Sequence, residues 1–248
     1  MVEKKVLLTT LVRNRAWCLE KVLENWLNLN YPKSLMEIFF QTHNNNDSTL
    51  SILRSFQESY KNIYSKITLM EYNFPSIDPK EHYWPKRKID CLRAMRNRYL
   101  AEIKDNDYIF AVDSDIILDP STLKYLLSLN KDIVSPVFWA TWGNSVQVPL
   151  PNVWSSGNYE FTQELLESLK KPGIYRVGGL GACTLISKKA IERGVNYNRV
   201  KNLPSDMILE DRDFCVRAEV LGLELWCSTR LKIKHLEKEE FLLEGIEC

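Results

Sequence analysis

Asp113 and Asp115 stand one residue apart, directly after the apolar run YIFAV at residues 108–112. In an extended chain alternate side chains point the same way, so both carboxylates are expected on one side with Ser114 turned aside. Two carboxylates this close repel each other and raise each other's pKa, a cost that a hard cation removes. Mg²⁺ and Mn²⁺ prefer oxygen ligands, often carboxylates together with substrate phosphates. The spacing therefore indicates a divalent-metal site, with a solvated turn at a strand end as the simpler alternative.

A second acidic cluster, Glu210, Asp211 and Asp213, opens a predicted helix over residues 210–222. Acidic residues in a first helical turn also stabilise the helix dipole, which is the structural alternative. Under the functional interpretation, Asp211 is a general base that removes a proton from an acceptor hydroxyl. Phe214 and Val220 are expected on the buried side of this helix.

His235 follows in the segment LKIKHL and is one of three histidines in the chain. A lone histidine is more often an ordinary surface or core residue than a ligand. A neutral imidazole nitrogen can nevertheless complete a metal site, so His235 is a candidate third ligand.

Strand and helix patterns alternate along the chain and must position these residues. Strands are expected at 6–12, 36–42, 67–73, 108–112 and 132–139, and helices at 17–29, 48–60, 86–104 and 121–129. The pattern predicts an α/β fold with a mostly parallel central sheet flanked by helices. The continuous apolar run before Asp113 favours a central strand, and such sheets bind ligands at the carboxyl ends of their strands.

The later part of the chain is less regular. Residues 173–191 are expected to form a strand, a glycine turn, a second strand and a helix, and 223–228 and 231–236 short strands. Residues 139–173 are rich in Trp, Asn, Pro and Ser and are expected to form long loops over a cleft. Trp139, Trp142 and Trp154 lie there, and they either stack on sugar rings or pack the loops.

The 248 residues show no internal repeat or linker, which favours one domain over 1–236 followed by a helical tail over 237–248. The tail either packs on its own domain, the simpler alternative, or docks on a partner or a membrane face. A net charge of +1, from 33 basic and 32 acidic side chains, gives no electrostatic case for nucleic acid.

No secretory signal and no apolar window of about 18 residues is recognised, so no transmembrane segment is expected. The six cysteines are scattered without a CxxC pair, which argues against a zinc site. They are interpreted as reduced thiols, and a cytoplasmic location is predicted.

Taken in order, these features resemble a GT-A fold glycosyltransferase of the family 2 type. The likeness rests on LLTTLVRN, the Arg96-Asn97 pair, AVDSD, GGLGA, the Glu210-Asp211 pair and the late His235. Two stretches, 31–49 and 107–139, resemble the glycosyltransferase domains of procollagen galactosyltransferases and lysyl hydroxylases. The second is also similar to fungal mannan-polymerase mannosyltransferases. The resemblance covers roughly residues 5 to 236 and implies a single Rossmann-like GT-A domain.

The resemblance also implies roles for particular residues. Asp113, Asp115 and His235 would hold Mn²⁺ or Mg²⁺ on the donor pyrophosphate, and Asp211 would be the catalytic base of an inverting enzyme. The nucleotide-sugar would be bound by Thr10, Arg13, Asn44, Arg96 and Asn97, together with Asp113 and Ser114. The acceptor side would include Gly178, Gly179, Gly181, Glu210 and Trp139.

The sequence departs from the family 2 pattern at the end of the second strand. An acid that contacts the base is usual there, whereas this chain has Thr42-His43, so UDP- and GDP-sugars both remain open. The similar mannosyltransferases retain configuration, so Asp211 is the base only if this enzyme inverts. The expected activity is metal-dependent transfer of a sugar to a hydroxyl of a glycan, a lipid-linked sugar or a protein.

Two other functions fit parts of the pattern. A sugar nucleotidyltransferase would usually have a glycine-rich phosphate loop after the first strand, where this chain reads TTLVRNRAW. A non-catalytic nucleotide- or carbohydrate-binding domain would have no need for the two acidic motifs and the histidine together.

Overall fold

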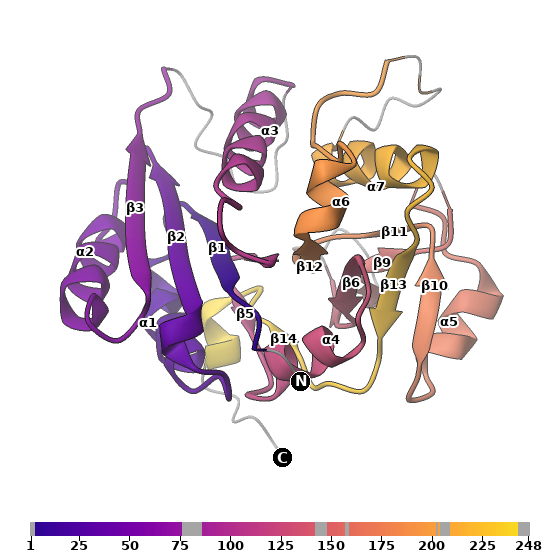
Figure 1. The fold of residues 1–248 in the computed structure, drawn as a ribbon, viewed down its shortest axis with the longest axis horizontal. Coiled ribbons are helices and arrows are strands. Elements are labelled where there is room, and N and C mark those ends of the chain that lie inside the picture. Colours follow the sequence, from indigo (N-terminus) through magenta and orange to yellow (C-terminus); the bar gives the residue numbers. More distant parts are fainter. Residues whose placement is uncertain are drawn as a thin grey trace.

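The computed structural model describes residues 3–75, 86–141, 148–156, 159–201, 203 and 209–242. Its main sheet has the strand order β10-β13-β6-β12-β4-β1-β2-β3, and Figure 1 labels these strands except β4. The strands are β1 (Val6–Val12), β2 (Met36–His43), β3 (Lys66–Tyr72), β4 (Tyr108–Val112), β6 (Ile133–Pro136), β10 (Ile174–Val177), β12 (Cys183–Ser187) and β13 (Leu225–Ser228). Strands β1 to β4 pair in parallel, as do β6 and β13, while β12 runs antiparallel to β4 and β6.

Helices cover both faces of this sheet. They are α1 (Ala16–Leu27), α2 (Thr49–Tyr60), α3 (Lys86–Ala101), α4 (Thr122–Ser128), α5 (Gln163–Leu169), α6 (Lys188–Glu192) and α7 (Glu210–Val220), with 3₁₀ turns η1 (Lys33–Leu35) and η2 (Glu239–Leu242). The α/β architecture with a mostly parallel sheet predicted from the alternating pattern is therefore confirmed.

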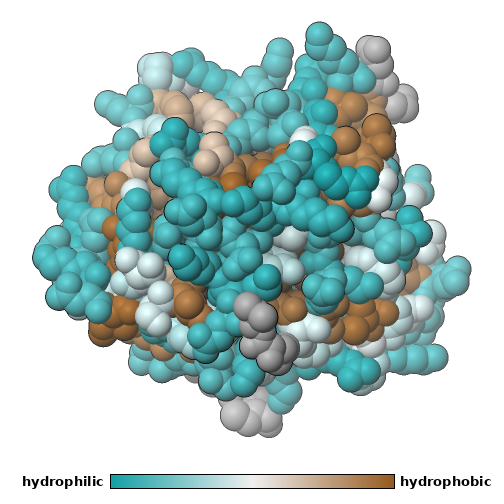
Figure 2. Space-filling view, in the orientation of Figure 1, coloured by the Kyte–Doolittle hydropathy of each residue, from teal (hydrophilic) through white to brown (hydrophobic). Residues whose placement is uncertain are grey.

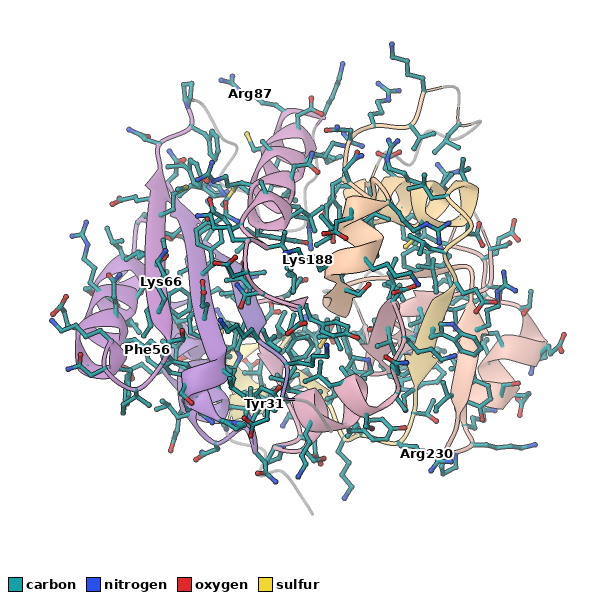
Figure 3. All side chains as sticks on the ribbon, viewed as in Figure 1. Tyr31, Phe56, Lys66, Arg87, Lys188 and Arg230 are labelled. Carbon is teal, nitrogen blue, oxygen red and sulfur yellow. The ribbon has the colours of Figure 1, made fainter. Side chains whose placement is uncertain are left out.

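The alternation of side chains along each strand divides the core into two layers. Leu8 and Phe110 belong to the cluster that contains α1, α2 and α4, whereas their neighbours Leu7 and Ile109 pack with α3, α6 and α7. Phe56 of α2, labelled in Figure 3, is one of the buried side chains of the first layer. Both faces of β4 are thus buried, as its continuous apolar sequence predicts.

The segment over 132–139 is not one strand. Strand β6 ends at Pro136, which has no N–H to donate to a ladder, and β7 (Trp139–Ala140) pairs instead with β8 (Leu150–Pro151). The following region, expected to consist of loops, also contains β9 (Val153–Trp154) paired with β11 (Gly179–Leu180), and helix α5. Thr162 caps α5 by accepting a hydrogen bond from the backbone of Leu165. The composition of this region, from which loops were expected, does not reveal this helix start.

The expected burial of Phe214 on helix α7 is confirmed, whereas that of Val220 is wrong. Phe214, Cys215 and Ala218 face the sheet, whereas Val220 is 82% exposed because it lies on the opposite side of the last turn. The view in Figure 2 shows a mainly hydrophilic face with small hydrophobic patches between polar side chains.

The described part of the tail packs on its own domain. Phe241 and Leu242 of η2 are partly buried against the core, and Nζ of Lys21 on α1 donates to the backbone oxygen of Leu242 at 2.7 Å. This part forms a 3₁₀ turn, and residues 243–248 lie outside the described residues. Among the helices that the structure describes, none is long and apolar enough to span a membrane.

Candidate active site

Asp113 and Asp115 lie at the carboxyl end of β4, in the middle of the sheet. The backbone N–H of Asp113 donates to the oxygen of Ala182 at 2.7 Å, which ties this end of β4 to the segment before β12. Ser114 between them is buried, and its backbone oxygen lies 3.7 Å from Sγ of Cys18 on α1. The backbone that carries the two aspartates is therefore held by the segment before β12 and by α1.

His235 reaches this site through strand pairing rather than through sequence proximity. Strand β14 (Lys234–His235) pairs with β5 (Ile116–Ile117), directly after Asp115, and the two lie side by side in Figure 1. The pairing places Nε2 of His235 3.5 Å from Oδ1 of Asp115.

A carboxylate also stands behind this imidazole. Oε1 of Glu237 lies 3.8 Å from Nδ1 of His235, and the other oxygen of Glu237 accepts hydrogen bonds from the backbone and hydroxyl of Thr141 at 2.9 and 2.7 Å. Histidines that bind metals commonly have such a carboxylate on their far nitrogen, which orients the ring.

Each aspartate also faces an arginine. Nη2 of Arg96 on α3 lies 3.4 Å from Oδ1 of Asp113, and Nη2 of Arg15 lies 3.4 Å from Oδ2 of Asp115. Arg15 stands just before α1, in the loop that follows β1. These arginines thus offset the repulsion expected between the two carboxylates.

These contacts shift the two carboxyl groups in opposite directions. Burial raises the pKa of Asp113 and outweighs the attraction of Arg96, although the 39% exposure of its side chain limits the rise. Burial alone would also raise the pKa of Asp115, but the close contact with His235 and the charges of His235 and Arg15 lower it overall. The same contact with Asp115 raises the pKa of His235 against the effect of burial.

The chemical types of these side chains suit a hard divalent cation. Asp113 and Asp115 provide carboxylates, and His235 provides an imidazole with the carboxylate of Glu237 behind it. Their arrangement is only partly that of a metal site. Asp115 and His235 are adjacent, whereas Asp113 is turned toward Arg96, and the described residues contain no ready cluster of three metal-binding side chains. A bound cation would compete with a proton for His235.

The acids of α7 have separate partners. Glu210 accepts from Nε of Arg96 at 3.1 Å, and Asp213 accepts from Nη2 of Arg93 at 2.5 Å. Both arginines come from α3, one turn apart, so α3 and α7 are joined by two buried ion pairs. Arg96 therefore bridges Asp113 and Glu210, and with them the two acidic motifs.

Asp211 has a different environment. Its Oδ1 accepts hydrogen bonds from the hydroxyl of Tyr159 and from the backbone N–H of Arg212. With Gly181, Arg96 and Tyr197 it lines a small hollow beside β4. Burial and the nearby charge of Glu210 raise its pKa, which suits a group that must accept a proton near neutral pH.

The glycine-rich segment lies against this acid. A Cβ on Gly181 would stand 2.9 Å from Oδ2 of Asp211, and a Cβ on Gly179 would stand 1.9 Å from the indole of Trp154. A Cβ on Gly178 would meet the backbone of Ser155 at 2.2 Å. Close packing against Ser155 and Trp154 therefore requires Gly178 and Gly179, whereas a Cβ on Gly181 would meet only the movable end of the Asp211 side chain.

The residues assigned to the nucleotide lie at strand ends, but several are held by protein contacts. Thr10 is buried in β1, and its hydroxyl has no hydrogen-bond partner among the described residues. Arg13 follows β1 and is partly buried. The amide of Asn44 binds the backbone of Phe74, and that of Asn97 binds the backbone of Tyr197 and the side chain of Asn198.

Of the three tryptophans in residues 139–173, the two that the structure describes differ in exposure. Trp139 on β7 is 40% exposed and can stack on a sugar, whereas Trp154 is buried against Tyr159 with ring centroids 4.5 Å apart. Trp142 lies outside the described residues.

Sequence reasoning missed four residues that the fold brings to this site: Arg15, Arg93, Tyr159 and Glu237. Arg93 had a usable signal, because it precedes Arg96 by three positions on the same predicted helix face. Tyr159 and Glu237 had none, since only the folding of distant segments places them beside Asp211 and His235.

Solved structures with this fold define the class. A mannosyltransferase from Pyrobaculum calidifontis in complex with GDP-Man and Mn²⁺ has a TM-score of 0.55 at 15% identity, over 91% of this chain and 55% of that one. TarS from S. aureus in complex with UDP has a TM-score of 0.55 at 14% identity, over 91% and 58%. The fold is that of the GT-A glycosyltransferases.

The family follows from sequence comparison. The N-terminal domain of glycosyltransferase family 25 matches residues 3–199, and the chain belongs to this family. Procollagen galactosyltransferase 2 of Mus musculus is 34% identical over 138 residues, 53% of this chain and 22% of the relative. Procollagen-lysine,2-oxoglutarate 5-dioxygenase 2 of Mus musculus is 24% identical over 92% of this chain and 29% of the relative.

These findings confirm the resemblance to procollagen galactosyltransferases and lysyl hydroxylases. The Mus musculus protein named inactive glycosyltransferase 25 family member 3 is also similar, at 26% identity over 75% of this chain and 33% of the relative. The chain spans about a fifth to a third of the length of these curated relatives.

Proposed function

We propose that this chain transfers a hexose from a UDP- or GDP-sugar to an acceptor hydroxyl, with inversion and with Mn²⁺ or Mg²⁺ at Asp113, Asp115 and His235. The observation that carries the proposal is the meeting of the two acidic motifs at Arg96, with Asp211 lining the adjacent hollow. Carboxylates suited to a cation thereby stand next to a carboxylate suited to proton transfer.

The chain's own residues then have distinct tasks. Thr10 and Arg13 at the end of β1 face the nucleotide, and Arg15 and Arg96 supply positive charge beside the diphosphate. When bound, the cation would neutralise charge on the leaving nucleoside diphosphate. Asp211 takes the proton of the acceptor hydroxyl as that oxygen forms its bond to the anomeric carbon.

The relatives suggest where to begin with substrates. Galactose is the first sugar to test, because the similar curated proteins are named galactosyltransferases. Both UDP and GDP-Man occur in structures of this fold, so both nucleotides belong in the panel. A protein hydroxyl is the first acceptor to test, ahead of a glycan or a lipid-linked sugar. A lipid-linked acceptor would fit a cytoplasmic enzyme in peripheral contact with a membrane.

The deciding experiment measures thermal unfolding and calorimetric binding with UDP- and GDP-sugars, in Mn²⁺ and in EDTA. A ligand at a hundred times its Kd stabilises the native state by about 2.7 kcal/mol. Stabilisation by one nucleotide that requires Mn²⁺, followed by metal-dependent transfer, is the expected result. Equal binding in EDTA with no transfer would reject the proposal.

The relative named inactive makes a non-catalytic binding domain the second candidate. This alternative predicts binding of a nucleotide or sugar without turnover. A sugar nucleotidyltransferase is distinguished by the release or consumption of pyrophosphate, which a glycosyltransferase does not produce.

A further inference from the structure

Tyr159 and Asp211 form a contact that the proposed reaction does not by itself explain. The Tyr159 hydroxyl and the backbone N–H of Arg212 both donate to Oδ1 of Asp211, the latter at 2.7 Å. Two donors on one oxygen fix the rotation of the carboxylate about its χ2 bond. The other oxygen, Oδ2, is left to meet a substrate.

Gly181 shows where Oδ2 lies. This oxygen is 2.9 Å from the position that a Cβ on Gly181 would occupy, so it lies over the glycine. Asp211 and Gly181 both line the hollow that also includes Arg96 and Tyr197. The carboxylate is therefore held with Oδ2 beside Gly181, and both residues line the same hollow.

Tyr159 is itself held firmly. Its backbone has φ of 55°, the left-handed region that a bulky residue rarely adopts, and such a conformation persists only where surrounding contacts stabilise it. Its ring packs on Trp154 with centroids 4.5 Å apart, and Trp154 in turn lies against Gly179. One chain of contacts thus runs from the glycine-rich segment through Trp154 and Tyr159 to Asp211.

We propose that Tyr159 is a positioning residue that orients the Asp211 carboxylate, so that Oδ2 faces the acceptor hydroxyl. This rests on the proposed function, in which Asp211 is the base.

The hydrogen bond also affects the ionisation of Asp211. The groups that face this carboxyl are Glu210 and Cys215 on its own helix, Arg96 on α3, and Tyr159. Burial and Glu210 raise the pKa of Asp211, whereas the Tyr159 hydrogen bond and Arg96 lower it. Removing the hydroxyl should therefore raise the pKa of Asp211 further, since the charged form loses a donor.

The test is Tyr159→Phe in the full chain, which keeps the ring on Trp154. The pKa of Asp211 is measured by ¹³C NMR titration of its carboxyl carbon, assigned with Asp211→Asn. A rise of about one unit is expected, the size that loss of a hydrogen bond to a carboxylate produces. The acid limb of the kcat profile should move to higher pH by the same amount, with kcat about tenfold lower at pH values below it.

Tyr175→Phe is the matched control, because its hydroxyl donates to the backbone of Lys171 away from this site. An unchanged Asp211 titration in Tyr159→Phe, or an equal shift in Tyr175→Phe, overturns the inference. If the parent chain transfers no sugar, the proposed function fails, whereas the carboxyl titration still decides whether Tyr159 controls Asp211.

Gly181→Ala independently tests the position of the Asp211 carboxylate, because Gly181 lies against Oδ2 whereas Tyr159 binds Oδ1. A new Cβ would displace Oδ2, and since this is the end of a side chain, the melting temperature should change little while kcat falls more than KM rises. Full kcat in Gly181→Ala would contradict the placement of Oδ2 over the glycine.

Discussion

At the scale of single residues, Arg96 joins the two acidic motifs through different nitrogen atoms. Its side chain is 13% exposed, and its burial is compatible with charge because Asp113 and Glu210 both stand within 3.4 Å. Removing one partner of a buried ion pair lowers the free energy of unfolding by more than the intact pair contributes to it, because the remaining charge stays buried without a partner.

Arg96→Met is therefore expected to lower the free energy of unfolding by about 3 kcal/mol. The loss comes from Glu210, whose side chain is 8% exposed and would lack its guanidinium partner. Urea unfolding at neutral pH measures the change. The control is Arg98→Met on the same helix, whose side chain is 48% exposed and whose loss should cost less than about 1 kcal/mol. Equal losses in the two variants would contradict this account of Arg96.

Asp113→Asn tests the proposed cation site with little change in shape. Transfer should fall roughly a hundredfold or more, because neutralising charge on the leaving group is worth several kcal/mol. The melting temperature should stay close to that of the parent, since Asp113 is the more exposed partner of Arg96. Rates with saturating Mn²⁺ provide the measurement, with the exposed Asp105→Asn as the control. A fully active Asp113→Asn would remove the case for this metal site.

At the scale of elements, the loop after β2 holds the starts of two helices. Asp47 accepts from the backbone of Ala16 in α1 and of Thr49 in α2, each at 3.0 Å. The two helices are thus fixed next to the end of β1, where Arg13 and Arg15 face the site. An anion at this point also favours both helix dipoles.

Asp47→Asn should lower the free energy of unfolding at pH 7 by about 0.5 kcal/mol. Burial alone would raise the pKa of Asp47, but hydrogen bonds from Thr49 and Ala16 lower it overall. A depressed folded pKa adds stability above the ordinary value, and this contribution is lost as the pH falls through the folded value. The difference between variant and parent should therefore vanish near about pH 2, as measured by urea unfolding at both pH values. A difference that persists at low pH would show that the charge is not the cause.

At the scale of the whole molecule, β12 joins the two halves of the sheet. It pairs with β4 on one side and β6 on the other, so the parallel N-terminal strands and the C-terminal strands share one hydrogen-bonded layer. Both buried clusters also contain residues from each half. The active-site residues come from both halves and depend on this continuity.

We expect one cooperative unfolding transition because neither half can separate without exposing both clusters. Differential scanning calorimetry should give equal calorimetric and van't Hoff enthalpies. Two resolved transitions, with only one shifted by nucleotide and Mn²⁺, would show instead that the halves unfold independently.

Much of the fold was predictable because local patterns carry it. The alternation of strands and helices, the buried β4 and the strand, glycine turn, strand and helix over 173–191 all appear as expected. The expectations from the sequence that proved wrong concern segments where tertiary contacts outweigh the local hydrophobic pattern. Pro136 splits one expected strand, α5 occupies a region expected to be loops, and Val220 is exposed.

The sequence by itself determined the candidate chemistry, because Asp113 and Asp115 follow a strand and Asp211 opens a helix, and local hydrophobic period sets the type of both elements. Only the tertiary structure decided which side chains meet them. His235 reaches Asp115 by pairing of β14 with β5, Arg96 reaches Glu210 by packing of α3 on α7, and Tyr159 reaches Asp211 from an irregular loop. These contacts join segments far apart in the chain, and burial in a common core, which no local pattern encodes, brings them together.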